Sequence, residues 1–173
     1  MSQTDQSQVR SRREAIVRAH MESENVHDFD ATIETFSHPR YELIASGQVH
    51  DGEAAVRAYF KETRTAFPDQ RNELIALHHL DDGVVVEFWL RGTHDGPLGT
   101  FAATGKRFEC RMTAFFFFDA DAIVCERVYF DSATVLRQLG VARDPLSLTG
   151  RLETLVSHPL TIGRGLVRRV TGR

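Results

Sequence analysis

The spacing of apolar residues predicts helices in the first part of the chain. A capping box formed by Ser11 and Glu14 predicts a helix over residues 11–26. Two more segments, residues 28–36 and 52–67, also repeat apolar residues at helical intervals. Their apolar stripes consist of Phe29, Ile33 and Phe36 in the first segment and Val56, Tyr59, Phe60 and Phe67 in the second.

After Pro68 the pattern becomes that of extended chain. Short turn signals separate long runs of apolar, β-branched and aromatic residues. We predict four long antiparallel strands and, earlier in the chain, one short strand; these cover residues 70–80, 84–94, 106–118, 122–131 and 40–45. A helix over residues 132–140 follows the last strand and ends at Gly140. Helices that precede the strands predict an α+β fold, in which N-terminal helices cover one face of a curved, cone-shaped sheet and enclose a pocket.

The length of 173 residues suits one domain with an extension. We expect a flexible N-terminus (1–10), a folded domain (11–142) and a basic, partly helical C-terminal extension (143–173). The extension has six arginines against Asp144 and Glu153, and it either packs on the domain or extends into solvent. The net charge of −3 gives no indication of nucleic-acid binding. The chain shows neither a signal peptide nor a membrane span, so we expect a cytoplasmic protein.

Four consecutive phenylalanines, Phe115 to Phe118, indicate an intermolecular contact. Successive strand residues point to opposite faces of a sheet, so two of the four rings face away from the helices. With Val124, Val128 and Phe130 they would form an exposed apolar patch, which monomers rarely have. We therefore predict a homodimer that packs through the convex face of the sheet; coverage by the C-terminal extension is the alternative.

Asp131 is the main candidate for chemistry, because it ends an apolar strand immediately before a helix. Either its carboxylate caps that helix, or it projects into the pocket, where desolvation would raise its pKa and make it a better general base. A tight last hairpin with Phe118 opposite Ile123 places Asp131 opposite Cys110. A register slip by one residue places Glu109 and Arg111 beside Asp131 instead.

Other polar residues give weaker indications. His94 ends the third long strand and is a candidate polar partner for Asp131. The chain has no pair of histidines at metal-ligand spacing, and Cys110 and Cys125 have no such spacing either, so we expect no metal and no cofactor. A hydrolase would need a second carboxylate, for which Glu87 and Glu109 are the candidates.

Three segments, "HDGEAAVRAYF", "GTHDGPLGTFAATGKRFE" and "ERVYFDSATVLRQLG", together resemble the SnoaL-like polyketide cyclase family of the nuclear transport factor 2-like superfamily. The resemblance covers roughly residues 13–140. It rests on the stretch Thr93 to Gly96, on Thr104-Gly105, and on Asp131 followed by the Leu-x-x-Gln-Leu-Gly stretch that ends at Gly140. It implies a conical α+β fold with a pocket and, in the cyclases, an aspartate at the strand end that acts as the base without a cofactor. That residue is Asp131 here.

The function expected from these observations is that of a cofactor-free enzyme of the cyclase or isomerase type. It would act on a small apolar carbonyl compound, from which Asp131 removes a proton next to the carbonyl. The alternative is a dimeric ligand-binding or scaffold domain without catalysis. Hydration or epoxide opening is a further possibility. The residues expected to contact the ligand are Tyr129, Trp89, Met112, Arg111, Phe60 and Tyr41, with His94 or Tyr129 as the polar partner of the base.

Overall fold

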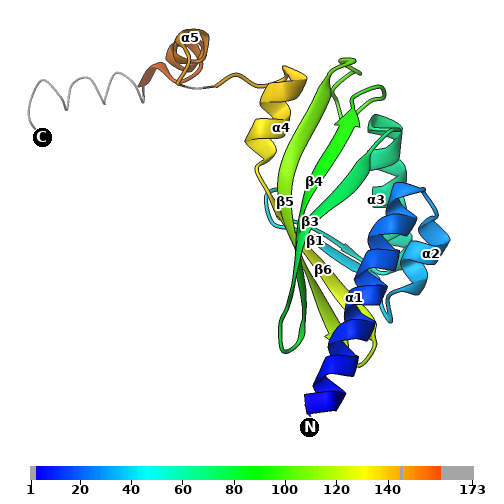
Figure 1. Cartoon of the computed structure of the whole chain (residues 1–173). Helices are drawn as coiled ribbons and strands as arrows, with labels where there is room; N and C mark the ends of the chain where they lie inside the picture. Colours follow the sequence, from blue (N-terminus) through cyan, green and yellow to red (C-terminus); the bar gives the residue numbers. More distant parts are fainter. Residues whose placement is uncertain (1–2, 145, 161–173) are drawn as a thin grey trace, which may run out of the picture.

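The computed structural model describes residues 3–144 and 146–160. Five helices are described: α1 (Gln3–Asn25), α2 (Phe29–Glu34), α3 (Glu53–Ala66), α4 (Ser132–Leu139) and α5 (Leu148–Ser157). Six strands form one sheet: β1 (Arg40–Leu43), β2 (Gln48–Asp51), β3 (Arg71–His79), β4 (Gly83–Thr93), β5 (Arg107–Asp119) and β6 (Ala122–Phe130). The strand order is β2-β1-β6-β5-β4-β3, and the helices α1, α2 and α3 cover one face of the curved sheet (Figure 1).

The predicted α+β class is confirmed, and the sheet is mixed. Strand β1 runs parallel to β6, whereas the other neighbours are antiparallel. Strand β2 is not among the predicted strands. Its four residues are mostly exposed, so they lack the apolar alternation by which a strand is recognised.

Helix α1 begins at Gln3, which corrects the predicted start at Ser11. The capping-box pattern therefore lies inside the helix, where backbone groups already have helical partners. The face of α1 that packs on the sheet contains Val17, His20, Met21 and Glu24, all of them buried. Two of these four side chains are ionisable, which is unusual for a helix face that packs against a core.

A β-bulge in β6 decides which side chains face the helices. The last hairpin has the predicted tight turn, with Phe118 opposite Ile123, but the next pair is Phe117 with Cys125. Val124 is thus an extra residue in β6, and every later pair shifts by one position. As a result, Glu126 lies opposite Phe116 on the helix-covered face, and both side chains are buried.

The bulge also changes the apolar patch on the outer face. Phe115 and Phe117 do point away from the helices, as expected, but Val128 and Phe130 line the interior. The outer neighbours of the two rings are instead Tyr129, whose ring lies edge-on to Phe115, and Arg127, which lies over Phe117. The predicted membership of the patch is therefore wrong for Val128 and Phe130.

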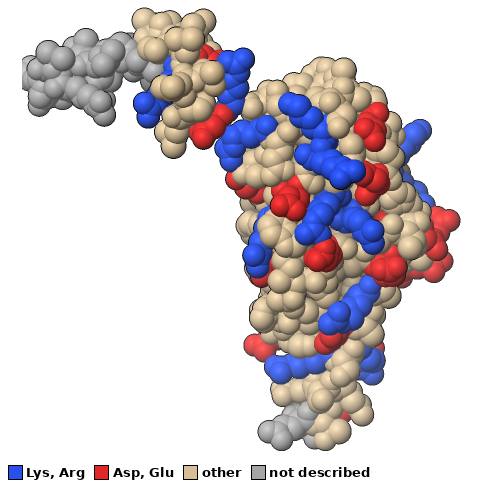
Figure 2. Space-filling model, turned by 45° about the horizontal axis from the view of Figure 1, so that its top comes forward, with Lys and Arg blue, Asp and Glu red and all other residues tan. Residues whose placement is uncertain are grey.

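Helix α4 packs against the N-terminal end of β5, and α5 projects away from the domain (Figures 1 and 2). The Gln138 side chain makes two hydrogen bonds to the backbone of Glu109, at 2.8 and 3.0 Å. The predicted helix in the extension is present as α5, and its Leu148 and Val156 are largely exposed. Figure 2 shows acidic and basic side chains intermixed over the face of the domain in view. The arginines from Arg164 onward lie outside the described residues.

None of the helices in the described part of the chain is long and apolar enough to cross a membrane.

Candidate active site

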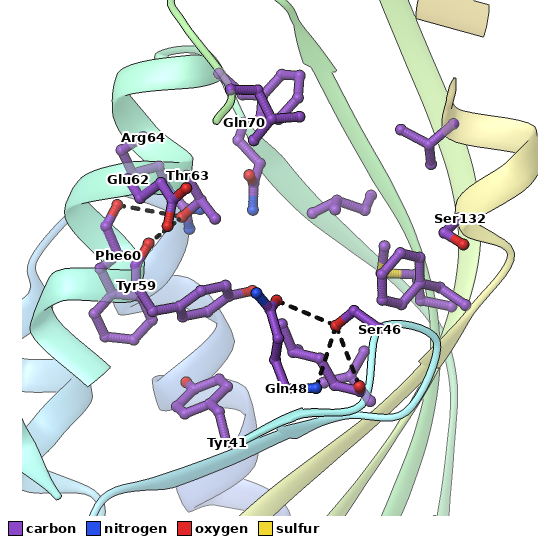
Figure 3. Close-up of a pocket in the computed structure, with 18 of the residues that line it drawn as sticks. Tyr41, Ser46, Gln48, Tyr59, Phe60, Glu62, Thr63, Arg64, Gln70 and Ser132 are labelled. Carbon is purple, nitrogen blue, oxygen red and sulfur yellow. Dashed lines mark hydrogen bonds between the residues drawn. The ribbon is translucent and has the colours of Figure 1, made fainter. Parts of the chain in front are cut away.

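A cavity of about 490 Å³ lies between the sheet and helices α1, α3 and α4. In the view of Figure 3, α3 with Tyr59 and Thr63 lies on one side of this cavity, and α4 with Ser132 lies on the other; Gln70, just before β3, lies near the top. The wall formed by β4, β5, β6, α4 and the connection before β5 is apolar; it consists of Phe88, Leu90, Leu98, Phe101, Phe108, Met112, Val128, Phe130, Val135 and Leu136. Such a surface suits the apolar body of a small organic molecule.

A cluster of buried polar side chains lies at the inner end of the cavity. It joins three elements: His20 and Glu24 from α1, Tyr41 from β1 and Glu126 from β6. The Nε2 atom of His20 lies 3.2 Å from Oε2 of Glu126 and 2.9 Å from the Tyr41 hydroxyl. That hydroxyl donates to Glu24 at 3.0 Å, and the Asn72 amide donates to the other Glu24 oxygen at 2.7 Å. Glu24, Tyr41 and Glu126 face the cavity.

The hydrogen bonds place one proton between His20 and Glu126. The Thr35 hydroxyl donates to the Thr32 carbonyl at 2.7 Å, so it accepts from Nδ1 of His20, 2.8 Å away. The single proton of the Tyr41 hydroxyl goes to Glu24. The contact between His20 Nε2 and Glu126 therefore contains one proton. The pair is either an imidazolium with a carboxylate or a neutral imidazole with a carboxylic acid. In either form, the pair holds a proton at the cavity floor.

The electrostatics of the cluster agree with a held proton. Burial raises the pKa of Glu126, because it penalises the charged carboxylate more than the contact with His20 favours it. Burial acts to lower the pKa of His20, but the hydrogen bond and the charges of Glu126 and Glu24 raise it overall. Burial and the same two carboxylates raise the pKa of Tyr41 far above its ordinary value, so Tyr41 remains a neutral donor.

The same cluster has the composition of a metal site. His20, Glu24 and Glu126 each offer a ligand atom, and these atoms lie within 4.8 Å of one another. One imidazole and two carboxylates suit a zinc ion, with a further position open to the cavity. A metal at this position would take the place of the proton between His20 and Glu126.

The structure divides the residues predicted to contact the ligand into two groups. Tyr41, Phe60 and Met112 line the cavity. Trp89, Arg111 and Tyr129 are on the opposite face of the sheet, so their predicted place in the pocket is wrong. Trp89 lies between the guanidinium groups of Arg111 and Arg91, and Tyr129 is 43% exposed.

The two carboxylates considered for a hydrolase are also on the outer face. Glu87 forms an ion pair with Arg111 at 2.6 Å, and Glu109 forms one with Arg91 at 3.3 Å. Neither of them lines the cavity. A second carboxylate is nevertheless available inside, because Glu24 and Glu126 occupy the floor together.

The carboxylate of Asp131 caps α4 and does not line the cavity. It accepts hydrogen bonds from the hydroxyl and the backbone N–H of Thr134, and the side chain is 60% exposed. These two bonds, with the charge of Arg137, hold its pKa below the ordinary value. Of the two roles considered for Asp131, the structure therefore shows the helix cap and not the desolvated carboxylate with a raised pKa. The pairing agrees with the slipped register, since Met112 lies opposite Phe130.

His94 is fully buried and holds the connection between β4 and β5. Its Nδ1 atom is 3.1 Å from the Thr104 hydroxyl, and its carbonyl accepts from the N–H groups of Thr104 and Gly105. The N–H of Gly96 donates to a backbone carbonyl at the end of α3. A Cβ on Gly96 would lie 1.9 Å from the carbonyl oxygen of Thr65, so this position requires glycine. His94 does not line the cavity, so the predicted partnership with Asp131 is not found.

The sequence analysis missed His20, Glu24 and Glu126. A signal for the first two was present, because Val17, His20, Met21 and Glu24 follow the i, i+3, i+4, i+7 spacing of a buried helix face. Glu126 and Arg127 interrupt the apolar residues of β6, but strict alternation from the hairpin turn would have placed Glu126 outside. Only the bulge brings it in.

Comparison with protein families agrees with this architecture. The model of the SnoaL-like polyketide cyclase family matches residues 14–139, and the chain belongs to this family. No curated protein matches the chain in sequence.

Solved structures share the fold at low sequence identity. A protein of Jannaschia sp. CCS1, described as a candidate SnoaL-like polyketide cyclase, is 19% identical, with a TM-score of 0.70 over 77% of this chain and 94% of that one. IdmH of Streptomyces antibioticus, a candidate polyketide cyclase, is 22% identical, with a TM-score of 0.64 over 73% and 97%. AclR of Streptomyces galilaeus, a candidate hydroxylase, is 19% identical, with a TM-score of 0.67 over 77% and 98%. These likenesses show the nuclear transport factor 2-like fold.

Proposed function

We propose that this protein is a cofactor-free acid–base enzyme of the cyclase or isomerase type that acts on a small apolar carbonyl compound. Its base is Glu126 rather than Asp131. The observation that carries the proposal is the buried 3.2 Å contact between His20 Nε2 and Glu126 Oε2 at the floor of an apolar cavity.

The chemistry begins with the ionised form of Glu126, which is present when the shared proton resides on His20. Glu126 accepts a proton from the carbon next to the substrate carbonyl, and the electron pair of that C–H bond moves into the carbonyl to give an enolate. A base with a raised pKa suits this step. Return of the proton to another carbon completes an isomerisation. Alternatively, attack of the enolate carbon on a second carbonyl closes a ring, and the proton on Glu126 passes to the alkoxide that forms.

The developing enolate oxygen needs a positive or donating partner. The Tyr41 hydroxyl faces the cavity and can turn its proton from Glu24 to this oxygen, and the charge of the imidazolium form of His20 lies 2.9 Å behind that hydroxyl. Both groups are held rigidly, because Thr35 orients His20 and Glu24 orients Tyr41. Asn72 in turn fixes Glu24, so the donors are in place before a ligand enters.

Proton exchange tests the proposal without knowledge of the natural substrate. The α-protons of 2-tetralone, a small apolar ketone, are followed by NMR in deuterated buffer. We expect the wild-type protein to accelerate exchange. The Glu126→Gln variant should catalyse the exchange roughly 10²- to 10⁴-fold more slowly than the wild-type protein. Asp131→Asn is the matched control, since it also neutralises one carboxylate and leaves the cavity floor intact. Loss of exchange in Asp131→Asn but not in Glu126→Gln would contradict the assignment of the base.

The alternative is a ligand-binding domain without catalysis. The observation in its favour is that the protein's own side chains satisfy the hydrogen bonds of the floor, as in a structural network. This alternative predicts that ketones bind in the cavity and that no variant changes their exchange rate.

We further propose that a second copy of the chain covers the outer face of the sheet around Phe115, Phe117 and Tyr129. The three rings form one connected group, with centroids of neighbouring rings 5.7 and 6.2 Å apart. Sedimentation velocity at micromolar concentration should show a dimer, and Phe117→Glu should shift it to monomer. A monomeric wild-type protein would contradict this contact.

A further inference from the structure

The cavity has a second group of polar side chains besides the acid–base cluster, and their hydrogen-bonding groups have no partner within the described residues. Gln70, at the start of β3, is 8% exposed, and its side chain makes no hydrogen bond there. In Figure 3 its amide points from the upper part of the cavity toward the interior. The Nε2 atom of His50 is buried and also without a partner.

Tyr59 joins these two residues on the same side of the cavity. Its ring stacks on that of His50, with centroids 4.6 Å apart, and all three residues line the cavity. The Tyr59 hydroxyl has no hydrogen-bond partner in the part of the chain that the structure describes. Figure 3 shows the Tyr59 side chain extending from α3 into the space below Gln70.

This arrangement contrasts with the floor, where each polar side chain bonds to another one. Buried polar groups in folded proteins are nearly always paired, so unpaired groups that face a cavity require an explanation. The opposite wall, which contains Phe88, Met112 and Val128, offers mainly apolar contacts. A ligand that fills the space must therefore present polar atoms to one wall and apolar surface to the other.

We infer that Gln70, His50 and Tyr59 form a subsite on the α3 side of the cavity that binds a second oxygen of the ligand, besides the group that reacts at Glu126. The amide of Gln70 and the hydroxyl of Tyr59 donate to a carbonyl or hydroxyl oxygen. Burial lowers the pKa of His50, so its imidazole is neutral and accepts from a ligand hydroxyl or donates, according to tautomer.

The chemical class that fits is a neutral compound with two oxygen functions and an apolar flank. A neutral group fits better than a carboxylate, because three carboxylates, Glu24, Glu62 and Glu126, line the cavity against one cation, Arg64. The inference rests on the proposed function only for the orientation of the ligand. The subsite itself is defined by the three unpaired side chains.

Equilibrium binding of two matched probes tests the subsite. The probes are 2-tetralone and 6-hydroxy-2-tetralone, which differ by one hydroxyl at the end opposite the ketone, and dissociation constants come from isothermal titration calorimetry. We expect the hydroxylated probe to bind roughly 3- to 10-fold more tightly to the wild-type protein, the gain typical of one net hydrogen bond. Gln70→Met and His50→Phe, which keep side-chain size, should bring the ratio close to one.

Two control variants separate this inference from the proposed function. Leu98→Met changes only the apolar wall and should keep the wild-type ratio. Glu126→Gln should abolish proton exchange and also keep the ratio, because the second oxygen does not contact Glu126. The inference is overturned if the two probes bind the wild-type protein equally, if neither binds, or if Gln70→Met and His50→Phe leave the ratio unchanged.

Discussion

Replacement of Glu126 by glutamine should lower the pKa of His20. In the wild-type protein, burial acts to lower that pKa, and the hydrogen bond and charge of Glu126, followed by the charge of Glu24, raise it above 6.5. Glu126→Gln has nearly the same shape, so it removes the two largest raising contributions and leaves the burial in place. The proton that the pair holds is then lost from His20 at a lower pH.

The same change has a predictable effect on stability. Because the pKa of His20 is raised in the folded protein, the stabilisation is fully present below pH 6.5 and is lost as the pH rises through the folded-state value. Within that window the folded protein holds a proton that the unfolded chain has released, so the unfolding free energy falls by up to about 1.4 kcal/mol per pH unit. The raised pKa of Glu126 acts in the same direction from pH 4.5 upward. Both contributions weaken in Glu126→Gln.

Two measurements check this reasoning. NMR of the labelled histidine rings gives the pKa of His20, and urea unfolding at several pH values above 6.5 gives the slope of stability. Glu62→Gln is the control, since it removes a carboxylate at the cavity wall that makes no contact with His20. A wild-type His20 pKa at or below 6.5, or a His20 pKa that Glu126→Gln leaves unchanged, would refute the shared proton.

Three further predictions concern other parts of the molecule. Asp131→Asn should leave ketone binding unchanged, and Asp131→Ala should increase hydrogen exchange in α4, because only asparagine keeps the cap; equal exchange in both variants would contradict the capping role. Dialysis against EDTA should leave proton exchange of 2-tetralone unchanged. If EDTA instead abolishes the exchange and zinc restores it, the cluster of His20, Glu24 and Glu126 binds a metal. Phe60→Ala should lower the unfolding free energy by roughly 3–5 kcal/mol in urea titrations, since Phe60 is 1% exposed and stacks on Phe29; a loss under 1 kcal/mol would mean that the cavity tolerates the gap.

Much of the fold follows from the sequence because the main elements have strong local signals. The turn at Asp81 to Gly83 and the period-two runs on both sides place β3 and β4 within a residue or two of their ends. Gly140 ends α4 in the left-handed conformation, as a glycine after a helix predicts. The exposed strand β2 and the first turns of α1 lack such signals, since their residues are polar and their positions depend on the neighbours that they contact.

The active site was less predictable, because it depends on one inserted residue. Strict alternation of side chains from the hairpin turn would place Tyr129 in the interior and Glu126 on the outer face. Val124 reverses both assignments. A bulge is formed through long-range pairing, here with the backbone of Thr35 and Ser37 also bonded to Ile123, so no local pattern in β6 predicts it.

The motifs that carry the family resemblance have a structural role in this chain. His94 and Gly96 fasten the β4–β5 connection to α3, Gln138 satisfies backbone groups of β5 beyond the end of β6, and Asp131 begins α4. These four residues support the walls of the cavity without lining it. This explains why the sequence led correctly to the family and the fold, whereas Asp131, expected in the cavity, caps a helix.

Chemistry in this cavity therefore depends on residues that the bulge and α1 bring together. A carboxylate on β6 can act as a base only if it faces the helices, and it can remain there only if a partner offsets the cost of its burial. His20 is that partner, and its side chain reaches Glu126 and Tyr41 from α1. An uncharged pair of the same size would fill the space equally well. The presence of an ionisable pair beside an apolar cavity is the strongest physical argument for the proposal that this cavity binds and transforms a ligand.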